Sequence, residues 1–163
     1  RMCKIWHKEH GLNYSILRPS ALYGTRDMIT RVLSQLVRAR FNTGTMRVQG
    51  PENKLAFSNV VDVAGAFATC AVNPNAKNEI FNCTRGQGRP ILEAAEMIQS
   101  RIGGKIETLP HDEFYPNRDT LCSDKLQELT DWRPTVDIEQ GIPAYLDWIL
   151  EQPYVKAMPL YHN

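Results

Sequence analysis

The residues that could act as nucleophiles, acid–base groups or metal ligands are scattered through this sequence. Tyr23 has no lysine within four residues to lower its pKa, so packing is favoured over catalysis for this tyrosine. No metal site is predicted, because the histidines lie among polar neighbours without metal-ligand spacing: His7, His10, His111 and His162. The cysteines are far apart, include no Cys-x-x-Cys pair and are expected to be reduced thiols: Cys3, Cys70, Cys83 and Cys122.

A glycine pair, Gly86 and Gly88, stands where a phosphate-binding loop could be sought, because Gly-x-Gly after a strand opens the dinucleotide fingerprint. The third glycine of that fingerprint is missing at the required spacing, and the pair follows a late strand. We therefore reject this loop as a phosphate cradle. Asp62, in a Val-Asp-Val-Ala stretch, is expected to cap a helix and not to take part in catalysis.

The composition indicates a soluble, packed chain with a small-molecule partner. A sequence of 163 residues can bury roughly 70% of the surface of its unfolded chain. Hydrophobic residues make up 42% and charged residues 23%, which fits neither disordered nor membrane classes. The net charge of +1 favours neither nucleic acid nor a membrane as a partner. With no apolar run near 18 residues and no visible signal peptide, a cytoplasmic location is expected.

Helical and extended patterns alternate along the first half of the chain. Residues 1–10 are predicted to be the last turns of a helix that Gly11 ends, and the start at Arg1 in mid-helix leads us to expect a fragment of a longer chain. A strand over 12–17 ends at Arg18-Pro19, since proline cannot donate to a strand ladder. Asp27 is the expected N-cap of an amphipathic helix to Arg40, and 46–49 is a short strand.

The second half continues the alternation. We predict helices over 63–72, 91–102, 124–129 and 138–150, and strands over 79–83 and 105–109. Gly103 and Gly104 stop the second of these helices. Such alternation is typical of an α/β fold with parallel strands.

Five short motifs, in order, carry a resemblance to a known family. They are Gly11-Leu-Asn-Tyr-Ser-Ile-Leu-Arg-Pro19 with Leu22-Tyr23-Gly24; Phe57-Ser-Asn-Val60-x-Asp62-Val63-Ala64-x-Ala66; Glu79-Ile-Phe-Asn82 with Thr84-Arg-Gly-Gln-Gly-Arg89; Asp112-Glu-Phe-Tyr-Pro116 with Arg118; and Leu129-x-x-Trp132-x-Pro134 with Glu139-x-Gly141-Ile142. Each motif is short and degenerate. Together, in this order, they resemble NAD(P)-dependent nucleotide-sugar epimerases and dehydratases of the extended short-chain dehydrogenase/reductase (SDR) type.

The resemblance implies an α/β fold, the C-terminal part of a Rossmann-type extended SDR fold with a small substrate-binding lobe. Residues 1–24 and 57–84 would finish the cofactor domain, 25–56 and 85–152 would build the lobe, and 153–163 would be a tail. The intact enzyme would use NAD or NADP to oxidise a sugar carbon transiently before epimerisation or dehydration. The fragment alone would be inactive, because the family's catalytic Tyr-x-x-x-Lys pair would lie upstream of Arg1, and no residue of this chain is assigned as catalytic.

The resemblance also implies binding residues. Pro19, Ser20 and Ala21 would contact the cofactor through backbone groups, and Ser20 would also face the substrate, although many relatives carry asparagine there. Val48, with Met46 and Gln49, would form an edge strand against the nucleotide base, with a simple core strand as the alternative. Lys54, close to where relatives carry an arginine, and Arg118 would hold the diphosphate, with a solvated surface arginine as the alternative for Arg118.

Two other functions remain open from the sequence. One is an NADP-dependent carbonyl reductase of the same superfamily, and the other is a non-catalytic binding protein on this fold. The expected partner is a nucleoside-diphosphate sugar, with no nucleic acid and no membrane. Exposed Met2, Ile5 and Trp6 would be consistent with a homodimer.

Overall fold

The computed structural model describes residues 1–27, 31–112, 120–153 and 155, and its secondary structure alternates between helices and strands. The helices are α1 (Met2–His10), α2 (Val32–Thr43), α3 (Val60–Val72), the 3₁₀ turn η1 (Pro74–Ala76), α4 (Ile91–Ile102), α5 (Asp124–Thr130) and α6 (Ile138–Leu150). The strands are β1 (Ser15–Pro19), β2 (Leu22–Tyr23), β3 (Thr45–Gln49), β4 (Lys54–Leu55), β5 (Ser58–Asn59), β6 (Glu79–Cys83), β7 (Arg89–Pro90) and β8 (Lys105–Leu109). Among the described residues no helix is long and apolar enough to cross a membrane.

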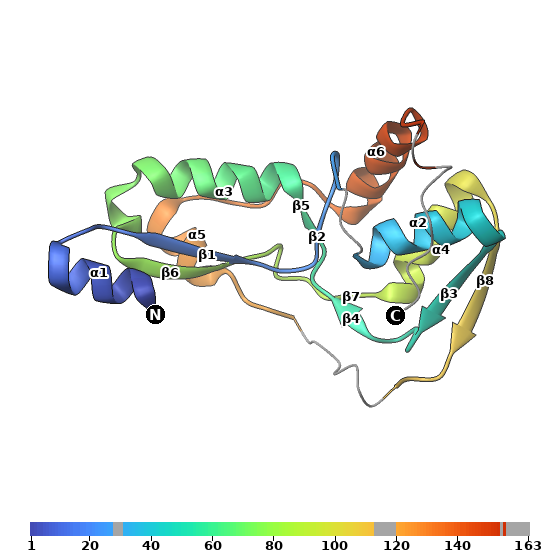
Figure 1. Ribbon diagram of the computed structural model, residues 1–163, viewed down its shortest axis with the longest axis horizontal. Coiled ribbons are helices and arrows are strands. Elements are labelled where there is room, and N and C mark those ends of the chain that lie inside the picture. The colour runs from blue at the N-terminus through green and yellow to red at the C-terminus, as the bar shows by residue number, and fades with distance from the viewer. Residues whose placement is uncertain (28–30, 113–119, 154, 156–163) are drawn as a thin grey trace.

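The buried side chains form two clusters, and most of the helices and strands that carry them lie toward opposite ends of the long axis of the molecule (Figure 1). The first cluster, which we call the sheet cluster, surrounds the parallel pair β1–β6, with Ser15 opposite Glu79 and Pro19 opposite Cys83. Its buried members are Val63, Ala66, Cys70, Ala76, Phe81, Cys83, Leu126 and Trp132. Helices α3 and α5 therefore both pack on this strand pair.

The second cluster, which we call the lobe, is built on the parallel pair β3–β8 and the helices α2, α4 and α6. Along β3 the burial alternates, with Met46 and Val48 inside and Arg47 and Gln49 outside. This alternation is that of a strand with one buried face. Short pairs join the lobe to the sheet cluster: β2–β5 is parallel and β4–β7 is antiparallel, and both lie near the middle of the molecule (Figure 1).

Most predicted elements agree with the structure. The helices over 91–102 and 138–150 and the strands over 79–83 and 105–109 match at both ends. Gly11 ends α1 in the left-handed conformation, with φ 67°, as expected of a glycine C-cap. The expected strand over 12–17 instead runs from Ser15 to Pro19, because its register follows β6.

Two predicted helix caps were wrong. The amide of Asp27 donates to the carbonyl of Gly24 at 3.2 Å in a turn, so α2 begins later, where the Ser34 hydroxyl accepts from the Arg31 amide at 3.1 Å. Asp62 lies inside α3, and the N-cap of this helix is Asn59. The Asn59 side-chain oxygen accepts from the Val61 amide at 2.9 Å. Asp62 is instead free to accept hydrogen bonds from a distant segment.

The packing also differs from the predicted domain boundaries. Leu126 and Trp132 belong to the sheet cluster, although residues 85–152 were expected in the lobe. Conversely, Tyr23 and Phe57 lie in the lobe core with their rings edge to face at a centroid distance of 6.3 Å. The chain therefore crosses between the two clusters more often than a division by sequence suggests.

The close packing of α6 against the Tyr23 hydroxyl requires a glycine in that helix. Tyr23 is 2% exposed, and burial raises its pKa more than the neighbouring Asn59 side chain lowers it. A Cβ atom at Gly141 would lie 2.0 Å from this hydroxyl and 3.0 Å from Nδ2 of Asn59. Gly141 thus lets α6 approach β2 and β5 closely, which agrees with the predicted packing role of Tyr23.

We predict that Gly141→Ala destabilises the full-length protein by about 1 to 3 kcal/mol, the usual cost of overpacking. The matched control is Gly65→Ala in α3, where a Cβ would meet its nearest atom, Nε1 of Trp132, at 3.8 Å. That exposed helical position should gain about 0.5 to 1 kcal/mol. Urea unfolding measures both changes, and equal effects would contradict the close contact.

Candidate functional site

The loop that leaves β1 lies at the carboxyl ends of two parallel strands, where ligands bind in open α/β sheets. Pro19 is exposed at the end of β1, while Ser20 and Ala21 are half-buried. The Ser20 amide donates to the Cys83 carbonyl at 3.4 Å, and the Ala21 carbonyl accepts from the Ser58 amide at 3.1 Å. The loop is therefore fixed both to β6 and to β5.

Some polar groups of this loop are left for a ligand. Proline has no amide hydrogen, so Pro19 can offer only its carbonyl. The Ser20 hydroxyl and the Ala21 amide make no hydrogen bond to the part of the chain that the structure describes. One hydroxyl and one amide donor thus remain beside the strand ends.

Buried side chains behind this loop are structural. Ser58 and Thr84 are buried, with their hydroxyl oxygens 3.4 Å apart. Cys83 is fully buried, and burial, followed by the neighbouring Cys70, raises its pKa to about 11. A thiol with such a pKa stays protonated at neutral pH and is a poor nucleophile.

The residues predicted to bind the substrate differ in their exposure to solvent. Lys54 is exposed on β4, at the middle of the molecule (Figure 1), and its Cβ would be 3.3 Å from a Cβ built at Gly88. The side chain of Val48 is 1% exposed in the lobe core, so any contact with a base has to come from its backbone. Arg118 lies outside the described residues.

The glycine loop after β6 folds against its own chain. The amide of Gly88 donates to Oγ1 of Thr120 at 3.0 Å, and a Cβ at Gly88 would lie 2.5 Å from that oxygen. The close approach that this glycine permits is therefore to Thr120. The Gly88 amide is thus already used within the chain.

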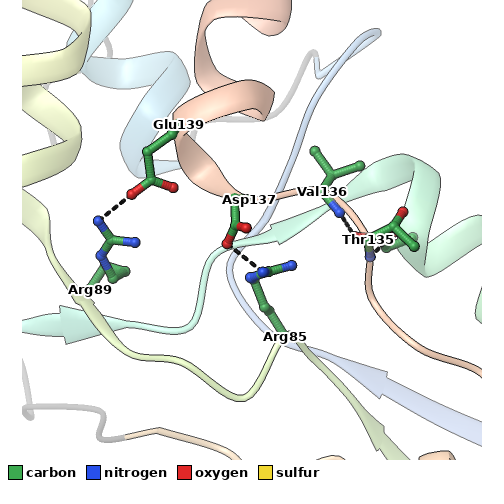
Figure 2. A network of polar contacts seen from close by, with 7 residues as sticks. Arg85, Arg89, Thr135, Val136, Asp137 and Glu139 are labelled. Atoms are coloured by element: carbon green, nitrogen blue, oxygen red, sulfur yellow. Dashed lines mark hydrogen bonds and ion pairs between the residues drawn. The ribbon is translucent and has the colours of Figure 1, made fainter.

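Two arginines near the strand ends are paired with carboxylates, as Figure 2 shows. Arg85 pairs with Asp137. The Arg89 guanidinium donates to Oε1 of Glu139 at 2.6 Å and, through Nε, to Glu93 at 2.8 Å. The hydrogen bonds that Arg89 donates to Glu93 and Glu139 raise the pKa of Arg89, and Arg89 in turn lowers the pKa of Glu139. These arginines are neutralised within the chain, which disfavours them as phosphate ligands.

Asp62 ties the two clusters together. Its Oδ1 accepts from the Thr135 amide and hydroxyl, both at 2.9 Å, and its Oδ2 accepts from the Val136 amide at 3.0 Å. Trp132 donates its indole N–H to the Asp62 carbonyl at 3.0 Å. Sequence reasoning missed this role because the partners are 70 or more positions away.

Other features do not point to a site. A hollow of about 460 Å³, lined in part by Tyr14, Phe67, Val72 and Lys77, lies at the amino end of β1, opposite to where ligands of such sheets bind. Within residues 1–27, 31–112, 120–153 and 155, no group of three or more metal-binding side chains is found. The four cysteines are free, with Cys70 and Cys83 buried and Cys3 and Cys122 exposed.

The fold and this strand-end loop define the class of the protein, a Rossmann-type α/β chain with a lobe attached at the carboxyl end of its sheet. The chain belongs to the NAD dependent epimerase/dehydratase family, whose model matches residues 1–84. The family predicted from the motifs is thereby confirmed.

Curated relatives support the family and differ in their reactions. A candidate UDP-glucose 4-epimerase of Methanocaldococcus jannaschii is 29% identical in an alignment of 154 residues that covers 90% of this chain and 48% of the relative. A UDP-N-acetyl-alpha-D-glucosaminuronate decarboxylase of Bacillus cytotoxicus is 26% identical, with 86% of this chain and 47% of the relative covered. The chain spans about half the length of these relatives.

Solved structures confirm the predicted fold. An epimerase from Methanothermobacter thermautotrophicus aligns with a TM-score of 0.85 at 17% identity, over 92% of this chain and 47% of its own. The UDP-glucuronic acid 4-epimerase of Bacillus cereus, solved in complex with UDP-glucuronic acid and NAD, aligns with a TM-score of 0.82 at 20% identity, over 92% and 49%. These similarities establish the Rossmann-type fold.

We predict that iodoacetamide at pH 8 modifies Cys122, which is exposed, and leaves Cys83 and Cys70 unmodified until denaturant is added. With a pKa of about 11, only about one Cys83 thiol in a thousand is ionised at pH 8. Peptide mass spectrometry with and without denaturant measures the labelling. Modification of Cys83 in the folded protein would show that the strand-end site reaches this thiol.

Proposed function

We propose that this chain forms the C-terminal, substrate-binding part of an NAD-dependent nucleotide-sugar epimerase or dehydratase. The observation that carries the proposal is the position of the Pro19–Ala21 loop, which lies at the strand ends of the sheet cluster and is hydrogen-bonded to β5, the strand that returns the chain from the lobe to α3. A sugar nucleotide bound there would touch both clusters. The names of the relatives support sugar nucleotides as its class.

The cofactor fits the groups that the loop offers. The Ser20 hydroxyl and the Ala21 amide would bind the nicotinamide end of NAD, and the Pro19 carbonyl would accept from its carboxamide. When bound, NAD accepts a hydride from the sugar and returns it. The chain's own contribution is to hold cofactor and sugar in register, and positioning of this kind can lower a barrier by roughly 7 to 11 kcal/mol.

The substrate would lie between the loop and the lobe. Lys54 would act as a point charge on the diphosphate, while Arg118 would bind it through two parallel N–H groups. Ser20 would face the sugar, and the backbone of Val48 would flank the base. Arg85 and Arg89 are occupied by carboxylates, which disfavours them for this task.

Assembly and location complete the proposal. Met2, Ile5 and Trp6 are exposed on α1, which buries none of its residues in this chain, and they would form part of a homodimer surface. A cytoplasmic location is proposed with it.

We predict that this 163-residue chain alone shows no turnover of UDP-glucose or UDP-glucuronic acid with NAD. It contains no Tyr-x-x-x-Lys sequence, so it lacks the acid–base pair that the family uses. Absorbance of NADH at 340 nm and chromatography of the sugar nucleotides measure the reaction. Measurable turnover by the purified chain would overturn this assignment of roles.

We further predict that Arg118→Ala in the full-length protein weakens binding of UDP by about 1.5 to 3 kcal/mol, the value of a charge-assisted contact. Lys54→Ala should weaken it less, because a point charge on an exposed side chain is more strongly screened. The control is Arg101→Ala, since Arg101 pairs with Asp147 on the exposed outer side of the lobe.

Calorimetric titration of UDP at two salt concentrations measures these affinities. The losses should shrink as salt rises, because screening weakens the wild-type contact. Equal affinities for all three variants would remove Lys54 and Arg118 from the site and favour the carbonyl reductase that binds no sugar nucleotide.

A further inference from the structure

A chain of polar contacts holds the lobe against the sheet cluster. The residues that form it are not those proposed to bind the ligand. We call it the lobe junction and define it by five residues: Asp62, Arg85, Arg89, Asp137 and Glu139. It fastens residues 131–137, which cross from α5 in the sheet cluster to α6 in the lobe (Figures 1 and 2). Each contact joins groups at least 50 positions apart in the sequence.

Arg85 occupies a central place in this junction. It follows Cys83 by two residues, and the Cys83 carbonyl accepts the amide of Ser20 in the strand-end loop. Its ion-pair partner, Asp137, is the N-cap residue of α6 but makes no side-chain capping bond. The Arg85–Asp137 pair therefore connects the strand-end loop to the first turn of a lobe helix.

The environment of Arg85 is unusual for a merely stabilising ion pair. Its side chain is 21% exposed, and its Nε and Nη1 atoms are buried without a hydrogen-bond partner among the described residues. Unpaired buried donors cost stability, and partly exposed ion pairs return little. An ion pair that adds so little stability is better explained by geometry. A planar guanidinium fixes the direction from which its carboxylate partner approaches.

We propose that Arg85 is a positioning residue, which through Asp137 sets the placement of the lobe over the strand-end loop and thereby the affinity for ligands that touch both. This rests on the proposed function for the identity of the ligand. Arg85 itself touches neither sugar nor cofactor. Asp62 holds the neighbouring residues Thr135 and Val136 by hydrogen bonds. The Arg85 ion pair is then the contact that fixes the Asp137 side chain itself.

The test compares Arg85→Ala with Arg101→Ala in the full-length protein. Both remove an arginine that pairs with an aspartate on or beside α6, but the Arg101–Asp147 pair lies within the lobe and is more than half exposed on both sides. Affinities for UDP-glucose and for NAD are measured by calorimetry. Amide hydrogen exchange of Thr135, Val136 and the first turn of α6 is measured in the same samples.

We expect Arg85→Ala to weaken UDP-glucose binding about tenfold, within the range of couplings between separate parts of a protein. NAD affinity should stay within about twofold, because the cofactor would contact only the sheet side, whereas a general loss of structure would lower both affinities. Exchange of the Thr135 and Val136 amides should accelerate. Arg101→Ala should change none of these quantities, and the reversed pair Arg85→Asp with Asp137→Arg should restore part of the UDP-glucose affinity.

The outcomes separate this inference from the proposed function. If wild-type protein binds no UDP-glucose, the proposed function fails, and the exchange data alone decide on the positioning role. Unchanged exchange and unchanged affinity in Arg85→Ala would overturn it, as would equal losses of NAD and UDP-glucose binding. Should Arg85→Ala fail to fold, Arg85→Lys, which keeps the charge but loses the planar fork, is expected to show the same selective loss in smaller degree.

Discussion

The arrangement of this molecule depends on one carboxylate, that of Asp62. Both of its oxygens are used, and among the described residues the groups that donate to them belong to Thr135 and Val136, in the segment between α5 and α6. Because Asp62 sits in the first turn of α3, it also complements the positive end of that helix. The Trp132 indole and the Arg85–Asp137 pair add further contacts that fix the course of the crossing segment toward the lobe.

Close packing follows from this tie. Once residues 131–137 are fixed, α6 starts at a defined point, and Gly141 in its first turns meets the hydroxyl of Tyr23. Tyr23 lies on β2, which leads from the sheet cluster toward the lobe, and Phe57 lies on the segment that returns from it. Both residues complete the lobe core. The two cores are thus joined by buried side chains as well as by polar contacts, which limits relative motion of the clusters.

The electrostatics of the strand ends are determined by pairing within the chain. Asp137 neutralises Arg85, while Glu93 and Glu139 share Arg89. A cluster of two arginines would otherwise suggest a phosphate site. Here the carboxylates remove that field locally, and the strand-end loop carries neutral donors, the Ser20 hydroxyl and the Ala21 amide.

The sequence by itself determined the helices and the longer strands. Apolar residues at helical spacing gave α4 and α6, and glycines such as Gly11 and Gly103 marked where helices end, because these signals are local. It also determined the family, since five short motifs in order are improbable together. Tertiary structure alone decided the two-residue strands, for Leu22 pairs with Ser58 and Leu55 with Arg89, and local periodicity cannot encode partners so distant. It likewise decided the role of Asp62, because a carboxylate that could cap its own helix instead accepts hydrogen bonds from residues more than 70 positions away, which only folding brings near.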